Sequence, residues 1–348
     1  MGGVFPDGKR FCKGGFTMKT RMLGDMEVST VGLGCMGFTH AYGDPMDEKE
    51  AVGVIHAAVD MGYTFFDTAH RYLGTWPDGS TAYNEELVGK ALAPYRGKVK
   101  IATKCGIHVG SKGERIVDSK PEQIRSELEM SLKQLGVETI DLYYQHRPDP
   151  NVPEEDVAGL MSDLIREGKI LRWGISEVDA ATLRKAHAIC PVTCIQNRYS
   201  MMARWHESLF PTLEELNIGF VAFSPLANGF LSDAYHNIEF HGKEDYRSAM
   251  PQFKEAGYKG NEPVIQLIRK YAREKNATPA QISLAWMLAK KPYIVPIPGS
   301  RRIERLKENA GASEITFTES ELQEIDKALD GMNLSVFSGT QSQLAKVK

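Results

Sequence analysis

"VGLGCMGFTHAYGDPM", residues 31–46, is the stretch that decides between two folds. Gly32, Gly34 and Gly37 spell G-x-G-x-x-G, the glycine pattern of the turn that binds a dinucleotide in a Rossmann fold. That turn runs straight into a helix. Here the segment after Gly37 contains a further glycine and then Pro45, so no helix opens there. The stretch therefore predicts the first strand of another fold, together with its exit loop.

The rest of the chain alternates between short apolar runs and segments of helical period. The predicted strands cover 30–35, 64–69, 99–105, 139–146, 170–176, 193–199, 219–225 and 293–299. The predicted helices cover 48–61, 84–93, 121–135, 154–167, 179–189, 204–216, 261–290 and 302–311. The strands are almost continuously apolar, as in a parallel sheet covered on both faces. Alternation on this scale predicts an α/β fold, a (β/α)8 TIM barrel, rather than a doubly wound sheet.

Further elements are predicted outside the repeating pairs. A β-hairpin over 18–32 is expected under the barrel floor, and Thr318 begins an extra C-terminal helix. Thr278 followed by Pro279 is a helix start signal. We expect residues 1–18 to be a flexible arm or leader and 19–348 to be one barrel domain. The segments 226–260 and 333–348 are expected to be an irregular loop and a tail that either covers the mouth or is disordered.

Composition excludes several classes of function. The chain has 348 residues and a net charge of −3, which favours neither a nucleic-acid nor a membrane-surface partner. No apolar run is long enough to span a bilayer. The five cysteines form no pair of C-x-x-C motifs, so we expect reduced thiols in a cytoplasmic protein. The histidines show no metal-ligand spacing, and no metal is expected. The sequence does not indicate an oligomeric state.

Polar side chains end three neighbouring predicted strands. Asp67 and Tyr72 follow the second strand, Lys104 ends the third and His146 ends the fourth. In TIM barrels the active site lies at the carboxyl ends of the strands. A lysine ammonium beside a tyrosine lowers the pKa of the phenol from about 10, and a carboxylate keeps the lysine charged. Such a set predicts a site that protonates a carbonyl as it is reduced, or deprotonates an alcohol as it is oxidised.

The last third of the chain predicts a phosphate site. The loops after the seventh and eighth strands of a TIM barrel commonly bind phosphate at a helix N-terminus. The segment after the eighth strand adds a hydroxyl and positive charges at Ser300, Arg301, Arg302 and Arg305. A solvated helix face paired with Glu304 and Glu308 is the alternative. The predicted acid–base residues need a source of hydride, which a nicotinamide nucleotide would bring, so the phosphate site is the favoured interpretation.

Several motifs occur in the order and positions of one family: FFDTAHRY, NEELVGKAL, IATK, DLYYQH, GISE, CIQNRYS, VAFSPL and VPIPGSRRIERLKENAGA. On these motifs the chain resembles the aldo-keto reductases, over about residues 19–329. The resemblance implies a barrel that reduces aldehydes and ketones with NADPH, or less often NADH, and a small-molecule substrate. It implies a tetrad of Asp67, Tyr72, Lys104 and His146, in which Tyr72 is the proton donor.

The resemblance also carries the family's cofactor contacts onto matching positions. It implies that Ser176 and Gln196 contact the nicotinamide carboxamide and that Phe223 stacks on the nicotinamide ring. Ser224, Pro225 and Leu226 would form the pyrophosphate loop. The 2′-phosphate would contact Ser300 and Arg305, with Gly299 and Arg301 beside them, and adenine would contact Glu308 and Asn309. By position in the first strand and its exit, Met36 and Cys35 are expected near the nicotinamide and the substrate.

The sequence departs from the family pattern at three places. Glu177 stands where many members have asparagine, and a carboxylate cannot donate a hydrogen bond to the carboxamide. Gly299 stands where several members have a phosphate-binding lysine, so NADH remains possible beside NADPH. An inserted Leu73 and the segment that follows it enlarge a loop in which Trp76 and Tyr83 are expected to shape the substrate mouth.

Two alternatives stay open beside a carbonyl reductase. The first is a regulatory barrel that binds the nucleotide and turns over slowly. The second is an isomerase-type barrel enzyme that acts on a phosphorylated metabolite without nicotinamide. Binding of NADPH and turnover over a panel of carbonyl compounds would discriminate among the three.

Overall fold

Eight parallel strands form the centre of the computed structural model, which describes residues 18–110, 114–235, 240 and 245–337. Around the sheet they are β3 (Leu33–Gly34), β4 (Phe65–Asp67), β7 (Lys100–Cys105), β10 (Leu142–Gln145), β11 (Trp173–Ile175), β12 (Cys194–Arg198), β13 (Gly219–Phe223) and β14 (Ile294–Pro296). Every strand lies within a predicted range. The Gly32 N–H donates to the Pro296 carbonyl at 3.0 Å, between the first and last strands. The predicted TIM barrel is confirmed.

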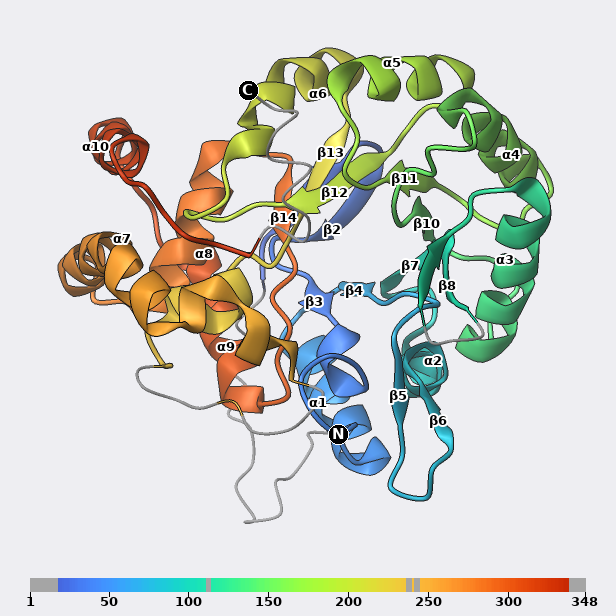
Figure 1. Cartoon of the computed structure of the whole chain (residues 1–348), viewed down its shortest axis with the longest axis horizontal. Coiled ribbons are helices and arrows are strands. Elements are labelled where there is room, and N and C mark those ends of the chain that lie inside the picture. Colours follow the sequence, from blue (N-terminus) through green and yellow to red (C-terminus); the bar gives the residue numbers. More distant parts are fainter. Residues whose placement is uncertain (1–17, 111–113, 236–239, 241–244, 338–348) are drawn as a thin grey trace.

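Helices surround the strands on the outside (Figure 1). They are α1 (Glu48–Asp60), α2 (Asn84–Leu92), α3 (Pro121–Leu135), α4 (Glu154–Arg166), α5 (Ala180–Ile189), α6 (Phe210–Leu216), α8 (Pro279–Lys290) and α9 (Ile303–Gly311). Two more, α7 (Glu255–Glu274) and α10 (Glu319–Asp330), pack against α8. Short 3-10 helices lie at Met36–Phe38, Ala93–Tyr95, Trp205–Leu209, Ala227–Ser232, Tyr246–Ala249, Pro251–Phe253 and Ala312–Glu314.

The helix predicted over 261–290 is wrong as a single element. The chain breaks between α7 and α8, where Asn276 takes a left-handed φ of 49°. Thr278 then starts α8 with a capping box, in which its side chain accepts from the Gln281 N–H and the Gln281 side chain accepts from the Thr278 N–H. At its other end α7 begins at Glu255, inside the segment predicted to be irregular.

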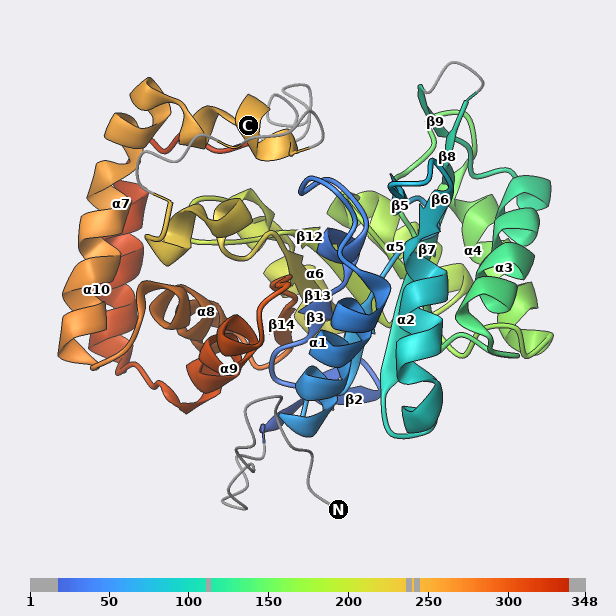
Figure 2. The ribbon, with the colours of Figure 1, turned by 90° about the horizontal axis from the view of Figure 1, so that it is seen from below.

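The N-terminal hairpin closes the barrel floor as predicted. Strands β1 (Thr20–Leu23) and β2 (Met26–Ser29) pair antiparallel. Leu23, Met26 and Val28 are buried in one cluster with residues that fill the barrel interior, such as Tyr144 and Val221. Figure 2 shows β2 at the end of the barrel opposite to the hairpin of β8 (Ile107–Val109) and β9 (Arg115–Val117). Because the floor is filled by apolar side chains, the open end is left for a site.

The two glycines of the opening motif allow close packing of backbones. A Cβ on Gly32 would lie 2.7 Å from Cδ1 of Phe65, and a Cβ on Gly34 would lie 2.7 Å from the Ile297 carbonyl oxygen. Only glycine fits at these distances. The motif therefore serves strand packing where the barrel closes, and a single 3-10 turn follows it instead of the Rossmann helix.

Several expectations concern residues at the ends of the chain or single side chains. Residues 1–17 of the expected arm lie outside the described residues, whereas Met18, which was assigned to it, is buried in the core. The cysteines within the described residues, Cys35, Cys105, Cys190 and Cys194, are free and buried. Over the same described ranges, no group of side chains could hold a metal ion and no helix is long and apolar enough to cross a membrane.

Candidate active site

A hydrogen-bonded set joins three of the four predicted rim residues. The Lys104 ammonium donates to Asp67 Oδ1 at 2.5 Å, to the Thr68 carbonyl at 2.7 Å and to the Tyr72 hydroxyl at 3.3 Å. The Gln196 amide donates to Asp67 Oδ2 at 2.7 Å, so both carboxylate oxygens are satisfied. Lys104 and Asp67 are almost fully buried. The lysine is therefore fixed behind the phenol, with its charge balanced by one carboxylate.

The protonation states follow from burial and this ion pair. Burial opposes the charge on Lys104, but the Asp67 carboxylate and its hydrogen bonds outweigh burial, and the pKa of the ammonium is raised. Burial also raises the pKa of the Tyr72 phenol, and the opposing effect of Lys104 is smaller. Lys104 lowers this pKa, as predicted, but burial outweighs that effect and the net change is a rise. Tyr72 is a protonated acid at neutral pH.

His146 completes the rim as a neutral ring. Its ring centroid lies 6.0 Å from that of Tyr72, with the planes nearly perpendicular. Burial, followed by the charges of Arg147 and Lys104, holds the pKa of His146 well below its usual range. An uncharged imidazole beside the phenol can orient a carbonyl oxygen by hydrogen bonding without adding charge to it.

A buried asparagine positions the loop that carries Tyr72. The Asn84 side chain donates to the Cys35 carbonyl and to Thr39 Oγ1, and it accepts from Thr68 Oγ1 at 2.6 Å. Its own N–H donates to the Tyr72 carbonyl at 3.2 Å. Asn84 therefore links the exit of β3, the exit of β4 and the loop that carries Tyr72. No motif in the sequence marks this residue.

One cavity of about 750 Å³ opens at the carboxyl ends of the strands and contains most of the predicted site. Asp67, Tyr72 and His146 line it, whereas Lys104 lies behind Tyr72. It is also lined by all the predicted cofactor residues except Ser176: Met36, Gln196, Phe223, Ser224, Pro225, Leu226, Gly299, Ser300, Arg301, Arg305, Glu308 and Asn309. Residues that lie more than 200 positions apart in the sequence thus line the same cavity.

The backbone after β13 forms a cradle suited to phosphate. Ser224, Ala227, Asn228 and Gly229 take positive φ values of 50°, 47°, 63° and 99°. Successive backbone N–H groups in turn conformations form concavities that bind anions, and such strain gathers at functional sites. The N–H groups of Ala227 and Gly229 are already donated to the Ser224 and Leu226 carbonyls. This segment is where the family resemblance expects the pyrophosphate.

The second phosphate element is the start of α9. No side chain caps its N-terminus, so its first N–H groups and the positive end of its dipole face the cavity region around Ser300. The Arg301 guanidinium donates through Nε to the Gly37 carbonyl, and its buried Nη2 has no partner within the described residues. Arg305 instead pairs with Glu308 at 2.6 Å. The open donor of Arg301, the uncapped start of α9 and the positive-φ segment after β13 are the groups that could hold the phosphates of a dinucleotide.

Besides Lys104, four predicted site residues do not line this cavity. Cys35 is fully buried in the outer core. Trp76 begins the turn of the hairpin formed by β5 (Leu73–Thr75) and β6 (Thr81–Tyr83), and neither it nor Tyr83 lines the cavity. The Ser176 hydroxyl is buried and donates to the Gln196 carbonyl at 2.6 Å, so it supports Gln196 from behind. These positions do not favour direct substrate contacts by Cys35, Trp76 or Tyr83.

Other segments border the cavity instead. The second mouth hairpin, β8 (Ile107–Val109) and β9 (Arg115–Val117), contributes Ile107 and Arg115. At the C-terminus, Phe337 lines the cavity, and the preceding chain is held where Asn261 and Ser335 exchange two hydrogen bonds. The expectation that the tail covers the mouth is thus met as far as residue 337, and residues 338–348 lie outside the described part of the chain.

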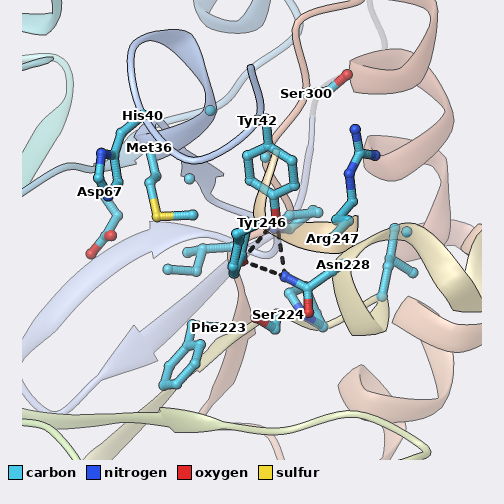
Figure 3. A pocket seen from close by; sticks show the side chains of 18 of the residues that line it. Met36, His40, Tyr42, Asp67, Phe223, Ser224, Asn228, Tyr246, Arg247 and Ser300 are labelled. Atoms are coloured by element: carbon cyan, nitrogen blue, oxygen red, sulfur yellow. Dashed lines mark hydrogen bonds between the residues drawn. The ribbon is translucent and has the colours of Figure 1, made fainter. Parts of the chain in front are cut away.

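A clasp of three side chains joins two loops at the cavity. The Asn228 amide donates to the Tyr42 hydroxyl at 3.0 Å and to the Tyr246 hydroxyl at 2.6 Å. Figure 3 shows both hydroxyls facing this amide, with Asp67 and Ser300 farther out on opposite sides. The sequence does not predict this clasp because its members lie far apart along the chain and share no motif.

Comparisons with known proteins agree with this geometry. A family model described as the aldo/keto reductase family matches residues 30–330. The probable aldo-keto reductase 1 of Glycine max is 41% identical over 307 residues, covering 87% of this chain and 86% of that protein. The glycerol dehydrogenase AKR11B4 from Gluconobacter oxydans superposes with a TM-score of 0.80 at 28% identity, covering 92% and 98% of the two chains. The holo form of aldo-keto reductase AKR11C1 from Bacillus halodurans gives 0.72 at 27% identity, covering 92% and 98%.

Proposed function

The chain belongs to the aldo/keto reductase family, whose members generally reduce carbonyl groups with NAD(P)H, and we propose that it is an NADPH-dependent reductase of aldehydes or ketones with Tyr72 as the proton donor. One observation carries the proposal. The Asp67–Lys104–Tyr72 hydrogen-bonded set and the phosphate cradle after β13 open into the same cavity.

Each residue of the set has a defined task in the proposed reaction. When bound, the reduced nicotinamide supplies the hydride that the side chains lack. Tyr72 donates its hydroxyl proton to the carbonyl oxygen, and the Lys104 ammonium stabilises the phenolate that remains. Asp67 holds the lysine charged and in place. The neutral His146 orients the carbonyl oxygen by a hydrogen bond.

The residues that would hold the cofactor favour NADPH over NADH. Phe223 offers a flat ring for the nicotinamide, and the strained segment from Ser224 to Gly229 offers the pyrophosphate cradle. Arg301 is the better candidate for the 2′-phosphate, because Arg305 is already neutralised by Glu308. The missing lysine at Gly299 is offset by this guanidinium.

The test is Tyr72→Phe, which removes only the hydroxyl. We expect carbonyl reduction at saturating NADPH to fall by about 10²- to 10⁴-fold, the usual contribution of a positioned general acid, while NADPH still quenches the protein fluorescence. Tyr83→Phe is the matched control, since Tyr83 is exposed and outside the cavity, and it should keep full activity. Near-full activity of Tyr72→Phe would show that another group donates the proton.

The wild-type protein decides between the proposal and the alternatives. Retention of NADPH with negligible turnover over a broad panel of carbonyl compounds would favour the regulatory barrel. Absence of any quenching by NADPH or NADH would favour an enzyme that acts on a phosphorylated metabolite.

A further inference from the structure

Two arginines that the proposed mechanism does not use lie beside the reactive end of the cavity. Arg147 directly follows His146 at the end of β10, and Arg198 ends β12 two residues after Gln196. Residues two apart on a strand share a face, so Arg198 points with Gln196 toward the barrel mouth. The guanidinium carbons of Arg147 and Arg198 lie 5.6 and 5.0 Å from the Phe223 ring centroid. Both therefore border the place proposed for the nicotinamide.

Arg198 is buried with open donors. The residue is only 6% exposed, and its Nε and Nη1 have no hydrogen-bond partner within the described residues. Besides Phe223, its guanidinium faces the Phe337 ring at 5.6 Å. Buried donors are nearly always satisfied in folded proteins, and a charged group left unpaired is especially costly. The open donors of Arg198 therefore indicate that a bound ligand supplies their acceptor.

The nearby carboxylates do not supply it. Asp67 is engaged by Lys104 and Gln196. Glu177 accepts from the backbone N–H of Arg198, not from its side chain, and it lies 3.6 Å from His206. Glu177 therefore compensates part of the positive charge from behind without occupying the open donors.

Arg147 and the cavity rim add further positive charge. The Arg147 guanidinium donates to the His146 carbonyl and to Ser176 Oγ, both uncharged acceptors. Arg71 and Arg115 line the same cavity, and neither forms an ion pair among the described residues. Four arginines thus line the cavity, and none of them donates from its side chain to a carboxylate within the described residues.

We propose that Arg198, with Arg147 beside it, binds an anionic group of the carbonyl substrate, so that this reductase prefers aldehydes or ketones that carry a carboxylate or phosphate. The inference rests on the proposed function and names its substrate class. The open Nε and Nη1 of Arg198 belong to different edges of the guanidinium, and an anionic oxygen group would accept from one of these edges in a charge-assisted hydrogen bond. The cofactor's own phosphates are expected elsewhere, at the cradle after β13 and at Arg301.

The experiment compares two substrates that differ in one charge, 4-carboxybenzaldehyde and methyl 4-formylbenzoate, in the wild type and Arg198→Gln. We expect the wild type to favour the acid. In the variant, kcat/KM for the acid should fall on the order of 10- to 100-fold through KM, while the value for the ester changes less than about threefold. Arg198→Lys should restore part of the preference. Arg125→Gln, which removes an exposed, ion-paired arginine on α3, should change neither substrate.

A binding measurement separates this inference from the reductase itself. Benzoate and phenyl phosphate are titrated calorimetrically into the NADP⁺-loaded wild type and Arg198→Gln, and NADPH affinity and thermal midpoint report the integrity of each variant. Anion binding by the wild type that the variant loses supports the site even if no carbonyl compound is turned over. Equal losses for acid and ester, or equal preference in both proteins with normal reduction, would overturn the anion site and leave the reductase intact. The relative affinities of the two anions identify carboxylate or phosphate as the preferred group.

Discussion

The phenol of Tyr72 lies between two opposing influences. Burial disfavours the phenolate, whereas the Lys104 ammonium at 3.3 Å favours it. In this arrangement burial is the larger effect, so the resting enzyme holds a protonated acid. The lysine then acts chiefly on the state in which the proton has left, because only there does its charge meet an anion. The proposed reduction requires a protonated Tyr72, and this balance provides it.

The raised pKa of Tyr72 predicts a pH profile. Reduction needs the protonated phenol, so kcat/KM for an uncharged aldehyde should stay level from about pH 6 to pH 9 and decline only above about pH 10, the ordinary pKa of tyrosine. His146 adds no titration in this range, since its pKa lies well below its usual value. Steady-state rates over pH 6–11 would test this, with NADPH binding followed at each pH. A decline centred near pH 7, with cofactor binding intact, would contradict it.

The sequence was sufficient to predict the positions of polar side chains that lie at the ends of strands. Asp67, Lys104 and His146 were predicted because the carboxyl ends of parallel strands meet at one rim. Cys35 also follows this pattern but faces the outer core, because one position along a strand reverses the side chain. Arg198 was missed, although its spacing of two from Gln196 carried the signal. No local pattern marked Asn84 as the support of the Tyr72 loop.

The loops at the cavity make their contacts through few side chains. Tyr42 precedes α1 and Tyr246 precedes α7, and the Asn228 amide holds both hydroxyls. The backbones also meet, since the Tyr246 N–H donates to the Ala41 carbonyl at 3.1 Å. Both tyrosines and Asn228 line the cavity, so a bound dinucleotide would lie under this clasp.

Tyr246→Phe should therefore speed release of NADPH. The variant keeps the ring and removes the acceptor of the 2.6 Å bond from Asn228. A net hydrogen bond of about 0.5–1.5 kcal/mol corresponds to a release rate roughly 2- to 10-fold higher. Stopped-flow fluorescence measures the rate. Tyr293→Phe, which removes a hydroxyl bonded to Glu214 and lies outside this cavity, should release NADPH at the wild-type rate. Equal rates in all three proteins would mean that the clasp does not retain the cofactor.

Helix α8 depends on its N-terminal cap. Thr278→Ala removes the side chain that accepts from the Gln281 N–H, and it should lower the free energy of unfolding by about 1 kcal/mol. Urea denaturation gives the value, with Thr316→Ala, at an exposed position that caps no helix, as the control. A loss no larger than that of the control would show that the capping box is dispensable.

The cap of α8 also illustrates which helices and strands could be predicted from the sequence. Strand ranges were recovered because buried parallel strands are apolar throughout, and most helices because their apolar faces repeat. A single helix was wrongly predicted over 261–290 because α7 is amphipathic, α8 is apolar, and only the short segment from Lys275 to Thr278 separates them. The signal Thr278–Pro279 was present and marks the true start of α8.

At the scale of the whole molecule, the cavity is assembled from distant parts of the chain. Met36, Tyr72, Phe223, Ser300 and Phe337 all line it. A ligand that contacts so many segments binds the folded state and not the unfolded chain. It therefore stabilises the fold by mass action, by about 2.7 kcal/mol at a concentration 100 times its dissociation constant.

This linkage predicts a difference between the two nicotinamide cofactors. At equal concentrations NADPH should raise the thermal midpoint more than NADH, because only NADPH offers a phosphate to the open Nη2 of Arg301 and the uncapped start of α9. Arg301→Gln should reduce the shift produced by NADPH toward that of NADH and leave the NADH shift nearly unchanged. Lys307→Gln, at an exposed position on α9 outside the cavity, removes the same charge and should preserve the difference. Equal shifts for the two cofactors in the wild type would mean that the arginine does not select the phosphate, and that the glycine at 299 leaves the protein without NADPH preference.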